Sequence, residues 1–291
     1  MHEDKPSRTA YKVALSLITL SAVPGMNHVL PPGIVDATEQ LLVASGATSP
    51  RAVRWSRSRR MVSVYKAFDC ILPGQFEAFA HRKAFCEHQV REGIAEGATQ
   101  ILVLGAGYDT LGWRLAPEFP NIHFFEIDHP ATAALKAKGI AAMGERPNLH
   151  LIAADLSKRA LAEVLESHAV WQPQARTVIL AEGLVMYLPS EAVEGLFRQC
   201  AAIADIGSRI ALSYIPAGVD GQPDVGRWSG LMRWLQTVLG EPWIWSIRPE
   251  QLGRFLEELG WRHAPELLQE TGKQGVEFYS IAILEGRGEA P

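Results

Sequence analysis

Two short apolar runs on either side of a glycine-rich loop limit the possible folds most strongly. Residues 100–104 read QILVL, the loop at 105–109 reads GAGYD, and a second, mostly apolar run at 122–127 ends in Asp128. Runs of this length and composition are typical of strands buried on both faces of a parallel sheet. Residues 110–115 can form one short helix, so the pattern predicts strand, glycine turn, helix, strand and acid in a doubly wound α/β sheet. The simpler alternative is a buried strand with a purely structural glycine turn.

The loop also narrows the kind of ligand. Asp128 lies 21 residues after Gly107, a spacing that places its carboxylate where it can accept hydrogen bonds from both hydroxyls of a ribose. A dinucleotide fingerprint has a third glycine where this sequence has Thr110, and Asp109 would repel a pyrophosphate. A cofactor without phosphates fits better, and S-adenosylmethionine is an adenosine with a cationic sulfonium and an amino-acid tail. We therefore expect S-adenosylmethionine as the cofactor.

Four motifs in order carry a family resemblance. They are GAGYDTLGWRL at residues 105–115, FEIDHP at 125–130, ADL at 154–156 and AEGLVMYLP at 181–189. Together they resemble the leucine carboxyl methyltransferase family, whose members are class I S-adenosylmethionine-dependent methyltransferases and include many bacterial proteins of unassigned substrate. The resemblance extends from about Arg82 to the C-terminal strand. It implies a doubly wound, mostly parallel seven-stranded sheet with an antiparallel last strand.

The resemblance and the strand-end positions together give a set of expected site residues. For cofactor binding these are Arg82, Gly105, Ala106, Gly107, Asp109, Asp128, Asp155, Leu156 and Glu182. The family uses an arginine at the offset of Arg82 to bind the cofactor's carboxylate, which suits a planar guanidinium; otherwise Arg82 is a surface residue of an amphipathic helix. We expect Asp155 to accept from the adenine amino group, although it can also cap the following helix. Glu182 is expected to bind the ammonium group and not to act as a general base.

The acceptor side is less defined by the sequence. The candidate catalytic residues are Tyr187, at the expected pocket mouth, and Tyr214, at the end of the fifth strand. Tyr187 has core packing as its alternative. Half of the eight tryptophans fall in residues 217–248, at positions 228, 234, 243 and 245. This segment is either part of an acceptor pocket or a helical insertion that packs its tryptophans on the sheet.

We expect two regions. Helical patterns broken by proline and glycine, with no strand pattern, predict a helical N-terminal lid over residues 1–90. Residues 91–291 are predicted to form the methyltransferase domain, with the Trp-rich helical insertion near 217–248. An apolar stretch at 13–23 resembles a signal-peptide core in length, but an acidic start and a missing cleavage site favour a helix.

Composition excludes several other classes. The net charge of -4 gives no footprint for nucleic acid, and the arginines within residues 51–60 have the spacing of a solvated helix face. The cysteines, Cys70, Cys86 and Cys200, are far apart, which indicates neither a disulfide framework nor a metal site and favours a reducing cytoplasm. Eleven apolar-leaning residues are too few to span a membrane, which needs about 20. The oligomeric state stays open.

The expected reaction is transfer of a methyl group to oxygen. No histidine pairs recognisably with a carboxylate, and a carboxylate acceptor is already ionised and needs no base. With the resemblance, this favours a methyl ester on a small molecule or peptide, and a hydroxyl or phenol of a secondary metabolite is the alternative. Two other classes stay open: a nicotinamide oxidoreductase, which Asp109 and Thr110 disfavour, and a non-catalytic module that only binds the cofactor.

Overall fold

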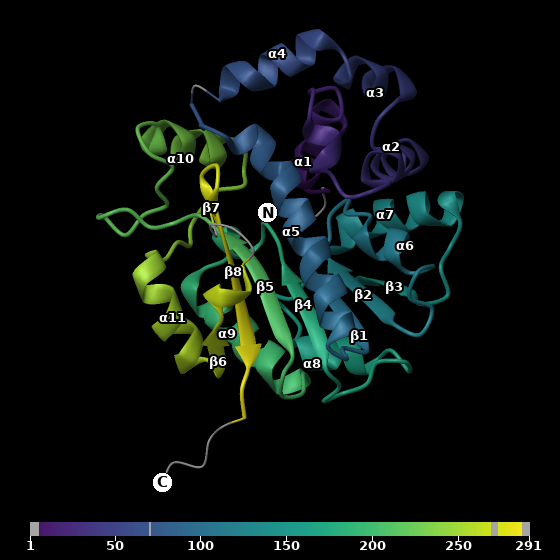
Figure 1. Ribbon diagram of the computed structural model, residues 1–291, viewed down its shortest axis with the longest axis vertical. Helices are drawn as coiled ribbons and strands as arrows, with labels where there is room; N and C mark the ends of the chain where they lie inside the picture. The colour runs from purple at the N-terminus through teal and green to yellow at the C-terminus, as the bar shows by residue number, and fades with distance from the viewer. Residues whose placement is uncertain (1–5, 70, 269–272, 287–291) are drawn as a thin grey trace.

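A twisted, mostly parallel sheet forms the centre of the molecule (Figure 1). The computed structural model describes residues 6–69, 71–268 and 273–286. The strands are β1 (Gln100–Leu104), β2 (His123–Asp128), β3 (Leu149–Ala153), β4 (Thr177–Ala181), β5 (Arg209–Tyr214), β6 (Trp261–His263), β7 (Lys273–Gln274) and β8 (Glu277–Leu284).

The strand order confirms the predicted fold class. Seven strands follow the order β3-β2-β1-β4-β5-β8-β6, and β7 adds two residues beside β8. Neighbours from β3 to β5 pair in parallel, whereas β8 is antiparallel to both β5 and β6. This is the mostly parallel seven-stranded sheet with an antiparallel last strand that characterises class I methyltransferases.

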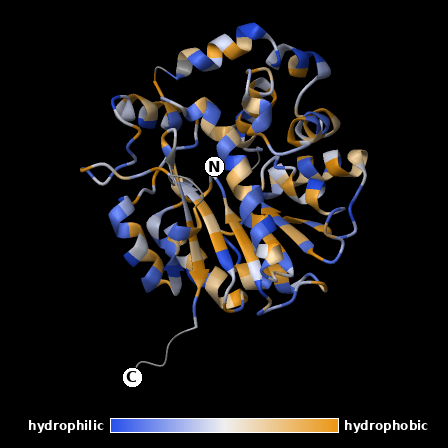
Figure 2. Cartoon of the chain, viewed as in Figure 1, coloured by the Kyte–Doolittle hydropathy of each residue, from blue (hydrophilic) through white to orange (hydrophobic). Residues whose placement is uncertain are grey.

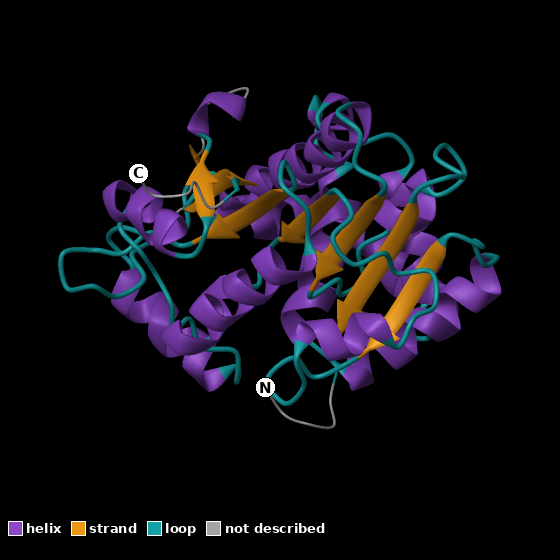
Figure 3. Cartoon of the chain, turned by 90° about the horizontal axis from the view of Figure 1, so that it is seen from below, coloured by secondary structure: helices purple, strands orange, loops and turns teal. Residues whose placement is uncertain are grey.

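Helices cover both faces of the sheet (Figure 3). One face carries α5 (Gln75–Ala95), α6 (Leu111–Leu115) and α7 (Pro130–Met143), and the other carries α8 (Leu161–Glu166), α9 (Ser190–Ile203) and α11 (Pro249–Glu258). Side chains alternate along β1, because Ile101 packs on the α5 side and Leu102 on the α9 side. All five residues of β1 are buried, which explains why its sequence is a continuous apolar run. Figure 2 shows the same concentration of apolar residues along the central strands.

The N-terminal helices lie at one edge of this sheet. They are α1 (Arg8–Leu20), η1 (Met26–His28), α2 (Ile34–Ala44), α3 (Pro50–Ser56) and α4 (Arg59–Phe68). The N-cap residues of α1, α3 and α4 are Ser7, Ser49 and Ser58. Each side chain accepts a hydrogen bond from a backbone amide of the first turn. α1 packs on α5 and α2 over the carboxyl ends of the parallel strands (Figure 1). The predicted helical character of this region is confirmed for the described residues.

The Trp-rich segment is less helical than we expected. Within residues 217–248 the structure has one helix, α10 (Ser229–Val238), and the remainder is loop and turn, with η2 (Val185–Tyr187) packed beneath it. η3 (Pro265–Leu267) is a short turn after β6. No helix in the described part of the chain is long and apolar enough to cross a membrane. Cys86 and Cys200 are buried free thiols, and Cys70 lies outside the described residues.

Candidate functional site

A cavity of about 1020 Å³ opens at the carboxyl ends of the parallel strands. It lies where the strand order reverses between β1 and β4, which is the usual ligand position in an open α/β sheet. All nine predicted cofactor-binding residues line it, at positions 82, 105–107, 109, 128, 155, 156 and 182. Residues of α1 and of the segment 240–244 line its other side. The chain therefore brings together the set that the sequence predicted.

The glycine loop needs its glycines for two reasons. Gly105 and Gly107 have φ values of 67° and 48°, a region that side chains rarely adopt. A Cβ on Gly107 would lie 2.9 Å from the Cβ of Ala10 in α1, and one on Gly105 would lie 3.1 Å from Leu184. Without side chains at these two positions, the loop can pack against α1 and Leu184 without a steric clash.

Asp128 ends β2 and faces the cavity. Its Oδ2 accepts from the backbone amide of Gly107 at 2.6 Å, and its Oδ1 accepts from the amide of His129 at 2.7 Å. A carboxylate has about four lone-pair sites, so these two bonds leave acceptor capacity for hydroxyl groups. Burial raises the pKa of Asp128, although the Gly107 amide acts in the opposite direction.

Asp155 follows β3 in a tight local turn. Its Oδ1 accepts from the amide of Ser157 at 3.0 Å and from the Ser157 hydroxyl at 2.6 Å. These hydrogen bonds hold the pKa of Asp155 below its usual value. The N-cap residue of α8 is Ala160, so the alternative in which Asp155 caps this helix is wrong. Its side chain is 25% exposed at the cavity rim.

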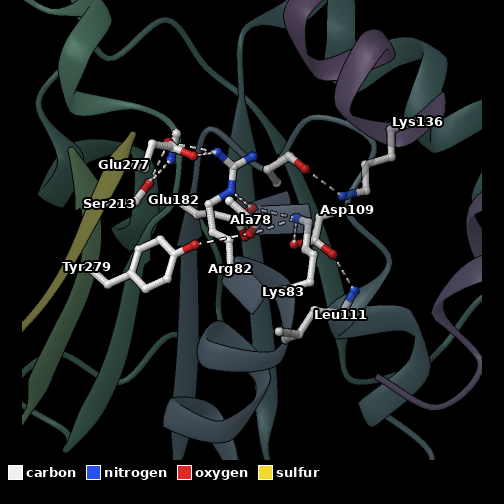
Figure 4. Close-up of polar contacts among 12 residues, drawn as sticks. Ala78, Arg82, Lys83, Asp109, Leu111, Lys136, Glu182, Ser213, Glu277 and Tyr279 are labelled. Atoms are coloured by element: carbon white, nitrogen blue, oxygen red, sulfur yellow. Dashed lines mark hydrogen bonds and ion pairs between the residues drawn. The ribbon is translucent and has the colours of Figure 1, made fainter. Parts of the chain in front are cut away.

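Five charged side chains that line the cavity form a buried cluster, whose polar contacts are drawn in Figure 4. Arg82 donates through Nε to Oε1 of Glu182 at 2.8 Å and through Nη1 to Oε2 of Glu277 at 2.6 Å. Lys83 Nζ lies 2.8 Å from Oδ2 of Asp109 and 2.9 Å from Oε1 of Glu182. The five side chains are between 4% and 9% exposed. We call this group the ion cluster.

Arg82, Lys83 and Asp109 keep their charges despite burial, and the ion cluster contains more acidic than basic groups. Burial disfavours the charged forms, but Glu277 and Glu182 outweigh it for Arg82, whose pKa is raised. The pKa of Lys83 is likewise raised by Asp109 and Glu182 against the effect of burial, and that of Asp109 is lowered by Lys83. Two cations and three carboxylates leave one net negative charge.

The ion cluster changes the roles expected of Arg82 and Glu182 in cofactor binding. We expected them to bind the carboxylate and the ammonium of a cofactor separately, whereas they also bind each other. Among the described residues, Nη2 of Arg82 has no hydrogen-bond partner, so the guanidinium keeps donors for a further acceptor.

Sequence reasoning missed Lys83 and Glu277. Lys83 adjoins Arg82 on α5, and Glu277 begins β8, where one acid opens an otherwise apolar strand. That acid is only 3% exposed. A charge at the start of a buried strand was the one available signal, because no motif surrounds it.

The two predicted catalytic tyrosines lie in different places. Tyr187 lines the cavity, and its hydroxyl accepts from Nε1 of Trp243 at 3.4 Å; burial raises its pKa, so the phenol is neutral near pH 7. Tyr214 is 2% exposed and packs against Trp245 and Phe278. It is not among the described residues that line the cavity, so the geometry gives a catalytic role for Tyr214 no support.

Of the four tryptophans in 217–248, only Trp243 lines the cavity. Trp245 is buried in the core, and Trp228 and Trp234 are exposed at the surface. The arginines of this segment do not line the cavity either. A wall of tryptophans and arginines around an acceptor is therefore absent from the described cavity lining.

Glu241 joins this segment to the start of α1. Its carboxylate accepts from the backbone amides of Thr9 at 2.9 Å and Arg8 at 3.1 Å, and from the hydroxyls of Ser7 and Thr9. A carboxylate at a helix N-terminus is favourable because the free amides and the helix dipole both attract negative charge. Ser7, Thr9 and Glu241 line the cavity, so this contact forms part of its roof.

No group of three or more His, Cys, Asp or Glu side chains in the described ranges could hold a metal ion.

Comparison with known proteins adds a family and several relatives. The family model described as leucine carboxyl methyltransferase matches residues 36–201, more than half of the chain. A Mycolicibacterium paratuberculosis protein provisionally named an S-adenosyl-L-methionine-dependent methyltransferase is 31% identical over 48% of this chain and 44% of the relative. A Mycolicibacterium gilvum protein with the same name is 28% identical over 62% and 56%. The chain thus spans about half the length of the curated relatives it matches.

Among solved structures, an O-methyltransferase family protein from Burkholderia thailandensis is 14% identical with a TM-score of 0.49, covering 72% of this chain and 61% of that chain.

Proposed function

The chain belongs to the leucine carboxyl methyltransferase family, and from this premise we propose that it is an S-adenosylmethionine-dependent O-methyltransferase. We propose further that the acceptor oxygen is a carboxylate of a small molecule or peptide, so that the product is a methyl ester. The observation that carries the proposal is the acidic ion cluster beside Asp128 in one cavity. Its net negative charge suits a ligand whose sulfonium and ammonium exceed its single carboxylate.

The cavity lining fits the cofactor group by group. Asp128 has acceptor capacity for the ribose hydroxyls, and Asp155 with Leu156 lies where the adenine would bind. Glu182 offers a carboxylate to the ammonium, and Arg82 offers Nη2 to the carboxylate. A Cβ at Gly107 would close the space between loop and roof. When bound, S-adenosylmethionine supplies an electrophilic methyl group.

This chain's residues contribute alignment and exclusion of water. The roof formed by α1 and Glu241, with the buried ion cluster, encloses the reacting groups, and such positioning can contribute about 7 to 11 kcal/mol. A carboxylate acceptor needs no deprotonation, which agrees with a cavity in which the phenol of Tyr187 stays neutral. We propose that Tyr187 orients the acceptor by donating its hydroxyl proton in a hydrogen bond.

A hydroxyl acceptor is a second candidate, favoured by the charge of the lining. The described acidic residues of the cavity outnumber the basic ones, Arg82, Lys83 and Lys158. The acids are Asp109, Asp128, Asp155, Glu182, Glu191, Glu241 and Glu277. An uncharged acceptor would avoid repulsion from this lining.

We also propose that residues 1–90 act as a lid on the methyltransferase domain at 91–291, since α1 supplies the roof. The free thiols of Cys86 and Cys200 support a reducing cytoplasm as the location.

Calorimetric titration of the purified protein with S-adenosylmethionine and, separately, with NAD tests the cofactor. We expect micromolar binding of S-adenosylmethionine, no binding of NAD, and at least a tenfold loss in Asp128→Ala. Asp36→Ala is the matched control, because its side chain is 80% exposed and is not among the described residues that line the cavity. Preference for NAD, or equal binding by both variants, would contradict the proposal.

Transfer of a radiolabelled methyl group then tests the chemistry. A methyl ester releases the label as methanol in mild alkali, whereas a phenolic ether keeps it. Alkali-labile label supports a carboxylate acceptor, and stable label supports the hydroxyl candidate. Tight cofactor binding with no transfer to any carboxylic acid or phenol would instead favour the non-catalytic module.

A further inference from the structure

The cavity lining also includes apolar side chains that the proposed cofactor contacts do not use. They come from six separate parts of the chain: Leu17, Leu72, Phe79, Met186, Ile215 and Val276. We call this part of the lining the apolar chamber. Met186, Ile215 and Val276 pack in one cluster with Leu72 and Tyr187, which places the chamber next to the predicted acceptor-orienting hydroxyl.

The chamber adjoins the reaction centre through Phe79. The ring of Phe79 lies 5.2 Å from the guanidinium carbon of Arg82, and Glu277 follows directly after Val276. The chamber is therefore continuous with the ion cluster, where the methyl donor is proposed to bind. A molecule that reacts there must place the rest of its body against these apolar side chains.

The chamber offers no cation for a charged body. Among the described cavity residues the cations are Arg82, Lys83 and Lys158. Arg82 and Lys83 are paired in the ion cluster, and the remaining Nη2 donors of Arg82 are proposed to bind the cofactor's carboxylate. Lys158 lies 3.5 Å from Asp155 at the adenine end. The acids nearest the chamber, Glu277 and Glu241, would repel a negative group. Burying an unpaired anion here would be strongly unfavourable.

A peptide body is also a poor fit. Each buried peptide unit brings an N–H and a C=O that need partners, and the six apolar side chains provide none. Gln75, which also lines the cavity, is already hydrogen-bonded to Glu277 and to the amide of Val276. The hydrogen bonds of Glu241 to Arg8 and Thr9 further hold the roof against the other wall. A rigid apolar molecule loses no hydrogen bonds on entering and gains from leaving water.

We propose that the apolar chamber binds the uncharged, apolar body of a small-molecule acceptor, on the scale of one or two fused rings, and excludes peptides and acceptors with a second negative group. The inference rests on the proposed function, which it deepens by naming the acceptor class. It covers both candidate nucleophiles, since either a carboxylate or a hydroxyl can be the single oxygen group of such a molecule.

Binding of matched probes tests the inference. The probes are 2-naphthoate, 2-naphthol, 2,6-naphthalenedicarboxylate and the tripeptide Gly-Gly-Leu, each titrated with and without saturating S-adenosylhomocysteine. We expect one of the first two to bind at least tenfold more tightly than the dicarboxylate and the tripeptide. Equal or tighter binding of the tripeptide or the dicarboxylate would overturn the inference.

A charge-inserting variant makes the test specific to the chamber. Leu72 is only partly buried, so Leu72→Lys places a cation in the chamber with little risk to folding. We expect it to bind the dicarboxylate at least tenfold more tightly than the wild-type protein does. Leu231→Lys, at a position 44% exposed on α10 and outside the cavity lining, is the control and should change nothing. An unchanged probe preference in Leu72→Lys contradicts the inference.

The cofactor titration separates the two possible failures. Both variants should bind S-adenosylhomocysteine as the wild-type protein does, because neither Leu72 nor Leu231 is a proposed cofactor-binding residue. Lack of S-adenosylhomocysteine binding with the expected probe preference would refute the proposed function and show only that the chamber binds apolar molecules with one oxygen group. Normal cofactor binding without the probe preference would overturn the inference and leave the proposed function standing.

Discussion

At the residue scale, Asp128 and Asp155 are similar acids in opposite environments. Burial raises the pKa of Asp128, whereas the hydrogen bonds from Ser157 lower that of the more exposed Asp155. Both are proposed to accept hydrogen bonds from the adenosine part of the cofactor, and only the ionised form offers full acceptor capacity. The two residues should therefore lose function at different pH values.

We expect cofactor affinity to fall as the pH is lowered from neutral, with the decline beginning above the ordinary pKa of an aspartate. Protonation of Asp128 removes acceptor capacity, and its raised pKa moves this loss above the ordinary value of about 3.9. Calorimetric titration at several pH values measures the effect. Asp128→Asn should bind weakly at all of them, because an amide does not titrate, while Asp155→Asn should keep the pH dependence.

His129 lies in the same cavity lining and needs a control of its own. His129→Asn should retain the decline in affinity at low pH. If the decline disappears in His129→Asn and persists in Asp128→Asn, the assignment to Asp128 is wrong.

At the element scale, α5 approaches β4 so closely that only glycine fits between them. A Cβ on Gly93 would lie 2.2 Å from Cγ2 of Val178, whereas a Cβ on Gly195 of α9 has no atom within 4 Å. Both glycines are helical, so they share the same backbone preference. Their substitution separates packing from helix propensity.

We expect Gly93→Ala and Gly195→Ala to have opposite effects on the free energy of unfolding, measured in urea. Gly93→Ala should destabilise by about 1 to 3 kcal/mol through overpacking. Gly195→Ala should stabilise by about 0.5 to 1 kcal/mol, since alanine favours a helix over glycine. Equal effects would show that the α5–β4 contact can relax without cost.

The start of α1 depends on a carboxylate from a distant part of the chain. Glu241→Ala removes the acceptor for the amides of Arg8 and Thr9, and loss of such a helix-terminal partner costs about 0.5 to 2 kcal/mol. Hydrogen exchange of these amides should accelerate, and cofactor dissociation should become faster because the roof loosens.

Ser49→Ala removes the cap of α3, none of whose described residues lines the cavity, and serves as the control. It should leave exchange in α1 and cofactor dissociation unchanged. Unaltered exchange at Arg8 and Thr9 in Glu241→Ala would show that Ser7 alone holds this turn.

At the scale of the whole molecule, the ion cluster links the stability of the fold to pH. The pKa of Asp109 is lower in the folded state than the unfolded value of about 3.9. Its contribution is therefore fully present above the unfolded pKa and is lost as the pH falls through the folded pKa. The protein should lose stability in acid partly for this reason.

We expect the free energy of unfolding to fall less steeply between about pH 5 and pH 2 in Asp109→Asn than in the wild-type protein, because the titrating group is gone. Urea unfolding at several pH values measures the slope. Asp36→Asn, an exposed acid, should keep the wild-type slope. A wild-type slope in Asp109→Asn would mean that other carboxyl groups set the acid limit.

The whole-molecule view also explains what the sequence could predict. The limits of β1 agree with the apolar run at residues 100–104, and α6 lies within the short helix expected at 110–115, because each is fixed by its own run of residues. The glycine loop and Asp128 were predictable for the same reason, since 21 residues separate Gly107 from its partner.

The missed contacts join distant parts of the chain. Arg82 meets Glu277 across 195 residues, and Thr9 meets Glu241 across 232. Neither Glu277 nor Glu241 stands in a motif, so their roles depend on strand order and helix packing. The role expected of Tyr214 lacks support because that side chain points into the core beside Trp245.

The distance along the chain between Thr9 and Glu241 has a consequence for biosynthesis. A ribosome adds roughly 5 to 20 residues per second, so the first turn of α1 waits on the order of 10 to 50 seconds before its partner is made, at a separation of 232 residues. The apolar face of α1 finds its partners much sooner, because Leu17 and Leu20 pack with side chains that lie between Val23 and Ala80. The start of α1 is thus translated early, but its hydrogen bonds to Glu241 can form only late in synthesis.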